Sequence, residues 1–324
     1  MRILMTGGTG FMGTALAARL KGEGHDVTAL GTADADLTDP RSLERFTARF
    51  ERLYHLAAWT QAGDFCLKHP GEQWLINQQI NTTVLSYWKR RQPQAKLIAM
   101  GSSCCYAGPD SREPSYMLGE PTPSLYTYAM TKRMLYQGLR ALNAQFKLRY
   151  LCAVASTLYG PGYHTDGRQN HFIFDLIGKI IRGKELGEEV VLWGDGLQKR
   201  ELIDRDDFIS LLARAVDALD DDLINIGSGE QLSIKDFAAE ICALVGYPPG
   251  KIRYDKSRYV GAASKCLNVD KLRALAPEVK LTPLREGLRK TIDWFYAVKA
   301  YESTPKGRGR KSSPSRSKKP RPRR

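Results

Sequence analysis

Tyr128 and Lys132 are the two residues whose types and spacing most directly suggest chemistry. They stand four positions apart, so in a helix they share a face and the lysine ammonium can lie near the tyrosine phenol. A neighbouring cation stabilises phenolate, and we expect it to lower the tyrosine pKa from about 10 towards working pH. Together with the Ser102 hydroxyl, the pair forms a set that can donate and recover a proton.

Ser102 follows a short apolar run, residues 96–100, of the kind that forms a buried parallel strand. Cys104 and Cys105 come shortly after it. In a doubly wound sheet the carboxyl ends of the strands border the ligand crevice, so the hydroxyl and the first thiol are expected beside a bound molecule. A cysteine in an apolar setting is more often a small hydrophobic residue, and we assign Cys105 to packing.

The amino-terminal residues predict a dinucleotide-binding turn, because an apolar strand at residues 2–5 leads through glycines into a helix over 14–21. Glycines let the backbone turn tightly and approach a pyrophosphate, whose charge then meets the amides and the dipole of the helix amino end. The expected cofactor contacts in this turn are Gly7, Gly8, Thr9, Gly10, Phe11, Met12 and Gly13.

The end of a second strand, residues 25–30, should meet the adenosine ribose, and the acids near it are Asp34 and Asp36, with Thr32 as a further candidate. An acid at this place favours NAD, whereas an arginine accommodates the additional phosphate of NADP. Asp36 and Leu37 could instead border adenine, or Asp36 could cap a helix beginning near Pro40.

A further strand over residues 53–58 ends in Leu56, Ala57 and Ala58, which we expect to lie against the cofactor because small side chains let it pass closely. His55 lies inside this strand, where a hydrogen-bonded core histidine is the favoured interpretation. A helix follows from near Pro70.

Strands and helices alternate as far as residue 159, which predicts an α/β fold of the Rossmann type, with a doubly wound parallel sheet and right-handed crossovers. Later segments predict a helix after Asn170, a helix over 234–245 capped by Ser233, and an amphipathic helix over 284–301. We expect a dinucleotide-binding domain at 1–160, including segments that return from the carboxyl-terminal half. A smaller α/β substrate domain should cover 161–302, followed by a disordered basic tail at 303–324.

The charge and the cysteines of the 324-residue chain limit its class. The formal net charge of +14 falls to +4 when the ten positive residues after Pro305 are set aside, so the body is only mildly basic. The six cysteines have no spacing that suits zinc, and we expect no metal site and a reduced, cytoplasmic location. The amino end does not resemble a signal peptide, and no apolar stretch is long enough to cross a membrane.

These motifs, in this order, resemble those of the extended short-chain dehydrogenase/reductases, the NAD-dependent epimerase/dehydratase family. The resemblance covers about residues 1–300, and within the family it is strongest to epimerase/reductases of GDP-linked 4-keto-6-deoxy sugars. The segments that carry it are the glycine turn, Ser102-Ser103-Cys104, Tyr128-x-x-x-Lys132, Leu158-Tyr159-Gly160-Pro161, Trp193-Gly194-Asp195-Gly196 and Arg200-Glu201.

The resemblance implies a role for each matching residue. Ser102, Tyr128 and Lys132 would form the reductase triad, with Tyr128 and Lys132 also contacting the cofactor. Cys104 and His171 would be the epimerase pair. The sugar nucleotide would be contacted by Lys179, Trp193, Arg200 and Lys265. The implied activity is an NAD(P)H-dependent 3,5-epimerase/4-reductase that works as a homodimer.

Three departures from the family pattern keep alternatives open. No arginine for the 2′-phosphate stands near Ala33, so both NADP and NAD remain. Ser264 replaces an expected arginine, and the loop at residues 59–63 differs, so the base and the sugar also remain open. The alternatives are another nucleotide-sugar 4-ketoreductase or C4 epimerase, and a nucleic-acid-binding protein on a Rossmann scaffold. The basic tail could give non-specific contact with nucleic acid through phosphates.

Overall fold

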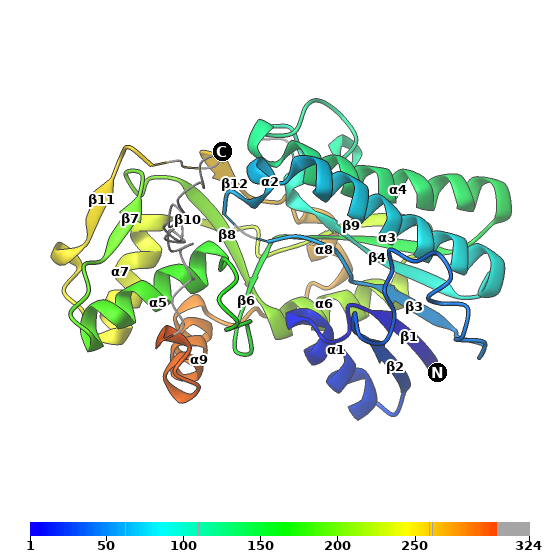
Figure 1. The fold of residues 1–324 in the computed structure, drawn as a ribbon, viewed down its shortest axis with the longest axis horizontal. Coiled ribbons are helices and arrows are strands. Elements are labelled where there is room, and N and C mark those ends of the chain that lie inside the picture. Colours follow the sequence, from blue (N-terminus) through cyan, green and yellow to red (C-terminus); the bar gives the residue numbers. More distant parts are fainter. Residues whose placement is uncertain (62, 109–110, 259, 261, 303–324) are drawn as a thin grey trace, which may run out of the picture.

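A six-stranded parallel sheet, with strands drawn from residues 2–226, organises the larger part of the computed structural model, which describes residues 1–61, 63–108, 111–258, 260 and 262–302 (Figure 1). The strands follow the spatial order β2-β1-β3-β4-β5-β9, and every neighbouring pair is parallel. The chain therefore leaves β1 in one direction and returns on its other side, as a doubly wound sheet requires. The strands are β1 (Arg2–Thr6), β2 (Asp26–Leu30), β3 (Arg52–His55), β4 (Lys96–Ser102), β5 (Tyr150–Ala155) and β9 (Asp222–Ile226).

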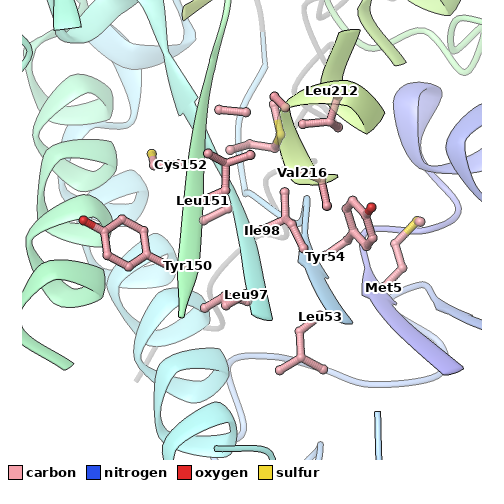
Figure 2. Packing of buried hydrophobic residues seen from close by; sticks show 14 of the residues in the cluster. Met5, Leu53, Tyr54, Leu97, Ile98, Tyr150, Leu151, Cys152, Leu212 and Val216 are labelled. Atoms are coloured by element: carbon pink, nitrogen blue, oxygen red, sulfur yellow. The ribbon is translucent and has the colours of Figure 1, made fainter. Parts of the chain in front are cut away.

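Helices cover both faces of this sheet (Figure 1). One face carries α1 (Phe11–Gly22) and α6 (Arg205–Ala218), and the other carries α3 (Pro70–Arg91) and α4 (Tyr126–Phe146). Figure 2 shows Val216 of α6 beside Ile98, while Tyr150 and Cys152 point towards α4. Strand side chains alternate between the two faces, and helices bury both faces, so the strands are apolar at most positions. The predicted fold class is confirmed.

The second half adds a separate buried core beside the end of the sheet, in which Phe174, Ile177 and Leu288 are buried. In it β8 pairs in parallel with β6 and β12 and antiparallel with β10. The elements are β6 (Thr157–Tyr159), α5 (Phe172–Glu185), β7 (Val191–Trp193), β8 (Lys199–Asp204), β10 (Gln231–Ser233), α7 (Ile234–Val245), β11 (Arg253–Asp255), β12 (Ser264–Lys265) and α9 (Leu284–Ala297). Two short helices, α2 (Phe65–Lys68) and α8 (Asp270–Leu275), pack near the sheet.

Some local predictions are confirmed and others are wrong. Ser233 caps α7 with a reciprocal capping box to Asp236, as expected. The helix predicted near Pro40 is absent from residues 31–50, all of which the structure describes as turns and irregular chain. The Asp36 carboxylate there accepts hydrogen bonds from the Thr38 backbone and hydroxyl, which closes a local turn instead of capping a helix.

The limits of the carboxyl-terminal part also differ from the prediction. The last long helix ends at Ala297, four residues short of the predicted position 301. The tail at 303–324 lies outside the described residues, and the domain limits stay a prediction. Among the described residues, no helix combines the length and the apolar character that crossing a membrane requires.

Candidate active site

The glycine turn after β1 lies directly against the continuation of β3. Gly7 has a φ of +70°, and a Cβ there would stand 2.7 Å from the backbone nitrogen of Ala57. A Cβ on Gly13 would stand 2.2 Å from the Gly7 carbonyl oxygen, so α1 can approach the turn only without a side chain at that position. Gly10 begins α1 without a side-chain cap. This close-packed glycine turn fits a pyrophosphate at the helix amino end.

The acids predicted to meet the ribose lie just beyond β2. The Asp34 carboxylate accepts the Gly31 amide at 2.8 Å, while Asp36 is exposed and Leu37 is buried. Contact with a cofactor stays a prediction for these residues, for the glycine turn, for Leu56, Ala57 and Ala58, and for Tyr128 and Lys132.

Ser102, Tyr128 and Lys132 come together where β4 ends and α4 begins. The Lys132 ammonium donates to the Met100 carbonyl at 3.0 Å and lies 5.9 Å from the centre of the Tyr128 ring. Ser102 acts to lower the pKa of Tyr128, so its hydroxyl lies near the phenol. Removal from water, with the nearby cysteines, raises the pKa of Tyr128 above its ordinary value. The expected lowering is wrong because burial and the cysteines raise the pKa of Tyr128 by more than Ser102 lowers it, so the phenol keeps its proton.

A chain of hydrogen bonds ties β1 to α4 and so positions Tyr128 and Lys132. The Asn81 amide donates to the Thr131 carbonyl at 3.3 Å, and its oxygen lies 3.1 Å from His55 Nε2. His55 Nδ1 lies 2.9 Å from the Thr6 hydroxyl. Burial lowers the pKa of His55 to about 4, so the ring is neutral, donates from Nε2 and accepts from Thr6. The interpretation of His55 as a hydrogen-bonded core residue is confirmed.

Arg133, which sequence reasoning missed, holds the turn that carries the thiols. It is buried on α4, and its guanidinium donates to the carbonyls of Cys105, Leu118 and Gly119. No periodicity or motif distinguishes this arginine in the sequence, because its partners are backbone atoms of a distant loop.

Cys104 lies against a lysine far away in the chain. Its Sγ is 2.8 Å from Lys265 Nζ, and its amide donates to the Ser102 hydroxyl at 3.2 Å. Burial acts to raise the pKa of Cys104, but the charge and hydrogen bond of Lys265, with Ser102 and Arg200, outweigh it and lower the pKa. Cys105 is fully buried, and burial raises its pKa to about 12, which agrees with packing.

His171 stands at the amino end of α5 and is its cap, in place of the predicted Asn170. Its Nδ1 accepts the Phe172 amide at 3.2 Å, so a neutral ring carries its proton on Nε2. Burial, followed by the charges of Lys265 and Arg200, lowers the pKa of His171 to about 4. Lys265 and Arg200 therefore act on the pKa of both Cys104 and His171.

The strand pairing explains why those two cations are neighbours. Lys265 of β12 is the register partner of Arg200 on β8. Arg200 donates to the Ala262 carbonyl at 2.7 Å, and the buried Glu201 carboxylate accepts the amides of Gly229 and Leu267 at 2.8 Å each. Glu201 therefore ties β8 to the segment that follows Lys265.

Trp193 offers an exposed ring between cations. The Lys179 ammonium lies 5.9 Å and the Arg258 guanidinium 5.7 Å from the ring centre. Lys179 also pairs with Asp175 at 2.7 Å. An exposed indole with adjacent cations suits a stacked base and a phosphate.

A cavity of about 530 Å³ lies away from this group, lined by residues such as Asp204, Leu211, Arg273 and Leu281. None of the predicted catalytic residues lines it.

A doubly wound sheet with a glycine turn after β1, and a serine, tyrosine and lysine gathered at the end of β4, defines a dinucleotide-dependent oxidoreductase of the short-chain type. The NAD dependent epimerase/dehydratase family matches residues 3–227, and the chain belongs to it. The predicted resemblance is confirmed, and the chain is an enzyme that uses NAD(P).

Relatives and solved structures agree with the family. GDP-L-fucose synthase 1 of Arabidopsis thaliana is 28% identical over 302 residues, which cover 91% of this chain and 93% of the relative. GDP-L-colitose synthase of Yersinia pseudotuberculosis is 26% identical, covering 91% and 98%. The NADP-bound crystal structure of a GDP-L-fucose synthetase from Naegleria fowleri is 25% identical and superposes with a TM-score of 0.81, covering 94% of this chain and 96% of that one.

Proposed function

We propose that this enzyme epimerises and then reduces a GDP-linked 4-keto-6-deoxy sugar, as the name GDP-L-fucose synthase indicates for its relatives. The observation that carries the proposal is the Cys104 sulfur, 2.8 Å from the Lys265 ammonium, together with the lowering of the His171 pKa by the same lysine. A reductase without epimerisation needs the phenol but has no use for a thiol with a lowered pKa.

The proposed chemistry begins at the carbons next to the ketone. A C4 carbonyl acidifies the hydrogens at C3 and C5, so the Cys104 thiolate can take a proton. The C–H bond breaks, an S–H bond forms, and the electron pair moves into an enolate whose charge lies on the C4 oxygen. His171 would return a proton to the opposite face, which inverts the centre. Negative charge from the substrate diphosphate offsets Lys265 and Arg200 and so favours protonation of His171.

Reduction would complete the reaction at C4. When bound, reduced nicotinamide supplies the hydride to that carbon. Tyr128, which keeps its proton in this environment, donates it to the C4 oxygen, and Ser102 supports the same oxygen by a hydrogen bond. Lys132 would orient the nicotinamide ribose. Trp193, Lys179 and Arg200 would hold the base and diphosphate.

The proposal is tested by NMR of the product formed from GDP-4-keto-6-deoxymannose in deuterated water, with NADPH and with NADH. Deuterium at C3 and C5 of a reduced product is expected. Cys104→Ser and His171→Gln should stop or misdirect this exchange while direct C4 reduction survives. Cys266→Ser is the matched control, because this half-exposed thiol is not assigned to catalysis and should leave exchange unchanged.

Two outcomes would contradict the proposal. Reduction by the wild type without deuterium at either carbon would indicate a 4-ketoreductase, and full exchange in the double variant would assign epimerisation to other groups. Interconversion of C4 configuration without net reduction would indicate a C4 epimerase.

A further inference from the structure

We propose that Lys265 is a positioning residue that holds Cys104 as a thiolate in the resting enzyme, before any substrate is bound. The inference rests on the proposed function for its catalytic meaning, and it replaces the expectation that Lys265 only contacts the sugar nucleotide.

The geometry places the ammonium on the sulfur itself. Lys265 Nζ and Cys104 Sγ are 2.8 Å apart although 161 positions separate them in the chain. Within the part of the chain that the structure describes, no carboxylate forms an ion pair with Lys265. Lys265 is half-buried, and among the described residues the Cys104 sulfur is the one side-chain hydrogen-bond partner of its ammonium.

The position of Lys265 is set by the fold and does not depend on a bound substrate. β12 pairs with β8 in parallel register, so Lys265 stands beside Arg200. The Glu201 carboxylate then accepts the Leu267 amide at 2.8 Å and fixes the chain just after β12. Strand pairing and one buried carboxylate therefore place the Lys265 ammonium beside the Cys104 sulfur.

The titratable groups around Cys104 supply no negative charge that would oppose the thiolate. They are Lys265 of β12, Arg200 of β8, Tyr128 of α4, Cys66 of α2 and the neighbouring Cys105. Burial raises the pKa of Tyr128, Cys66 and Cys105, so these three stay neutral, and the charged groups among the five are the two cations.

The same cation favours loss of a proton from both members of the pair and so leaves them with different charges. A positive charge lowers the pKa of both groups, which makes a thiol ionise and makes an imidazolium lose its proton. Cys104 becomes an anion and His171 a neutral ring with a proton on Nε2. Titratable groups whose environments give them different charges take different roles in proton transfer.

The experiment measures the pKa of Cys104 without substrate. Iodoacetamide alkylation is followed from pH 5 to 10, with peptide mass spectrometry to separate Cys104 from Cys105. The midpoint of the rate profile is used, because the reactivity of each thiolate also falls as its pKa falls. Cys266, whose pKa burial raises to about 11, serves as the internal reference.

The wild-type midpoint should lie below the ordinary cysteine value of about 8.5. Lys265→Met should raise it by about 1 to 3 pH units, the range for loss of an opposite charge at contact. Lys265→Arg should restore most of the shift. Lys199→Met is the matched control on the neighbouring strand and should leave the midpoint unchanged. The His171 pKa, read by NMR, should rise in Lys265→Met as well.

A wild-type midpoint at or above about 8.5, or a Lys265→Met midpoint within 0.3 units of wild type, would overturn the inference. The wild-type midpoint tests the inference by itself, even if Lys265→Met fails to fold. A low midpoint together with no deuterium exchange would leave this inference standing and reject the proposed function. Deuterium exchange together with a midpoint at the ordinary cysteine value of about 8.5 would reject this inference and leave the proposed function standing.

Discussion

Replacing Arg133 by methionine should destabilise the fold and loosen the turn that carries Cys104. Methionine keeps much of the apolar stem but removes every donor. The guanidinium bonds three carbonyl groups, and hydrogen bonds to a charged group contribute about 1.5–3 kcal/mol each.

Only part of that sum is lost, because the three carbonyls differ in exposure. Leu118 and Gly119 lie at the surface, where water can replace the guanidinium, whereas Cys105 is fully buried. A buried carbonyl without a partner costs about 1–3 kcal/mol. With a smaller contribution from the two exposed carbonyls, we expect a loss of about 2–4 kcal/mol in the free energy of unfolding.

Urea denaturation at pH 7 measures this loss, with the slope of the transition checked for constancy. Arg140→Met is the matched control, because Arg140 is exposed on the same helix and its replacement should change stability by less than about 0.5 kcal/mol. Arg133→Lys should lie between them, since one ammonium cannot reach all three carbonyls. The reasoning is refuted if Arg133→Met costs no more than the Arg140 control.

Three further predictions concern the site and the tail. Tyr128→Phe should lower the rate of hydride transfer by about 10²–10⁴-fold or more, while cofactor fluorescence titration shows nearly unchanged binding. Turnover of Tyr128→Phe above a tenth of wild type would contradict the assignment. Lys132→Met should weaken cofactor binding as well. The NMR signal of the His171 ring should titrate near pH 4, and a midpoint above 6 would contradict this. Because His55 and His171 bind protons more weakly in the folded than in the unfolded chain, the free energy of unfolding should fall as pH drops from about 6.5 towards 4. Truncation after Ser303 should leave turnover and KM within about twofold and remove any binding to RNA or DNA at low salt; an inactive but folded truncate would show that the tail reaches the site.

Local pattern was enough to predict the parallel sheet and the glycine turn, and Tyr128 and Lys132 lie on one helix, as the role assigned to their spacing requires. The spacing of i and i+4 in a helix, and the position of Ser102 at a strand end, depend only on the chain's own periodicity. Ser233 as the cap of α7 follows from the same short-range chemistry. The family pattern also named Cys104, His171 and Lys265, but it gave no contact between them.

Only the tertiary structure decided which groups meet and what charge they carry. Lys265 reaches Cys104 because β12 pairs with β8, and such long-range pairing leaves no mark in the surrounding residues. The pKa of Tyr128 moves upwards because of burial, which spacing cannot measure, and because of the cysteines that the fold brings near it. Desolvation depends on every element packed around a group, so the sequence by itself determined the residues of this site, and the packing determined their protonation.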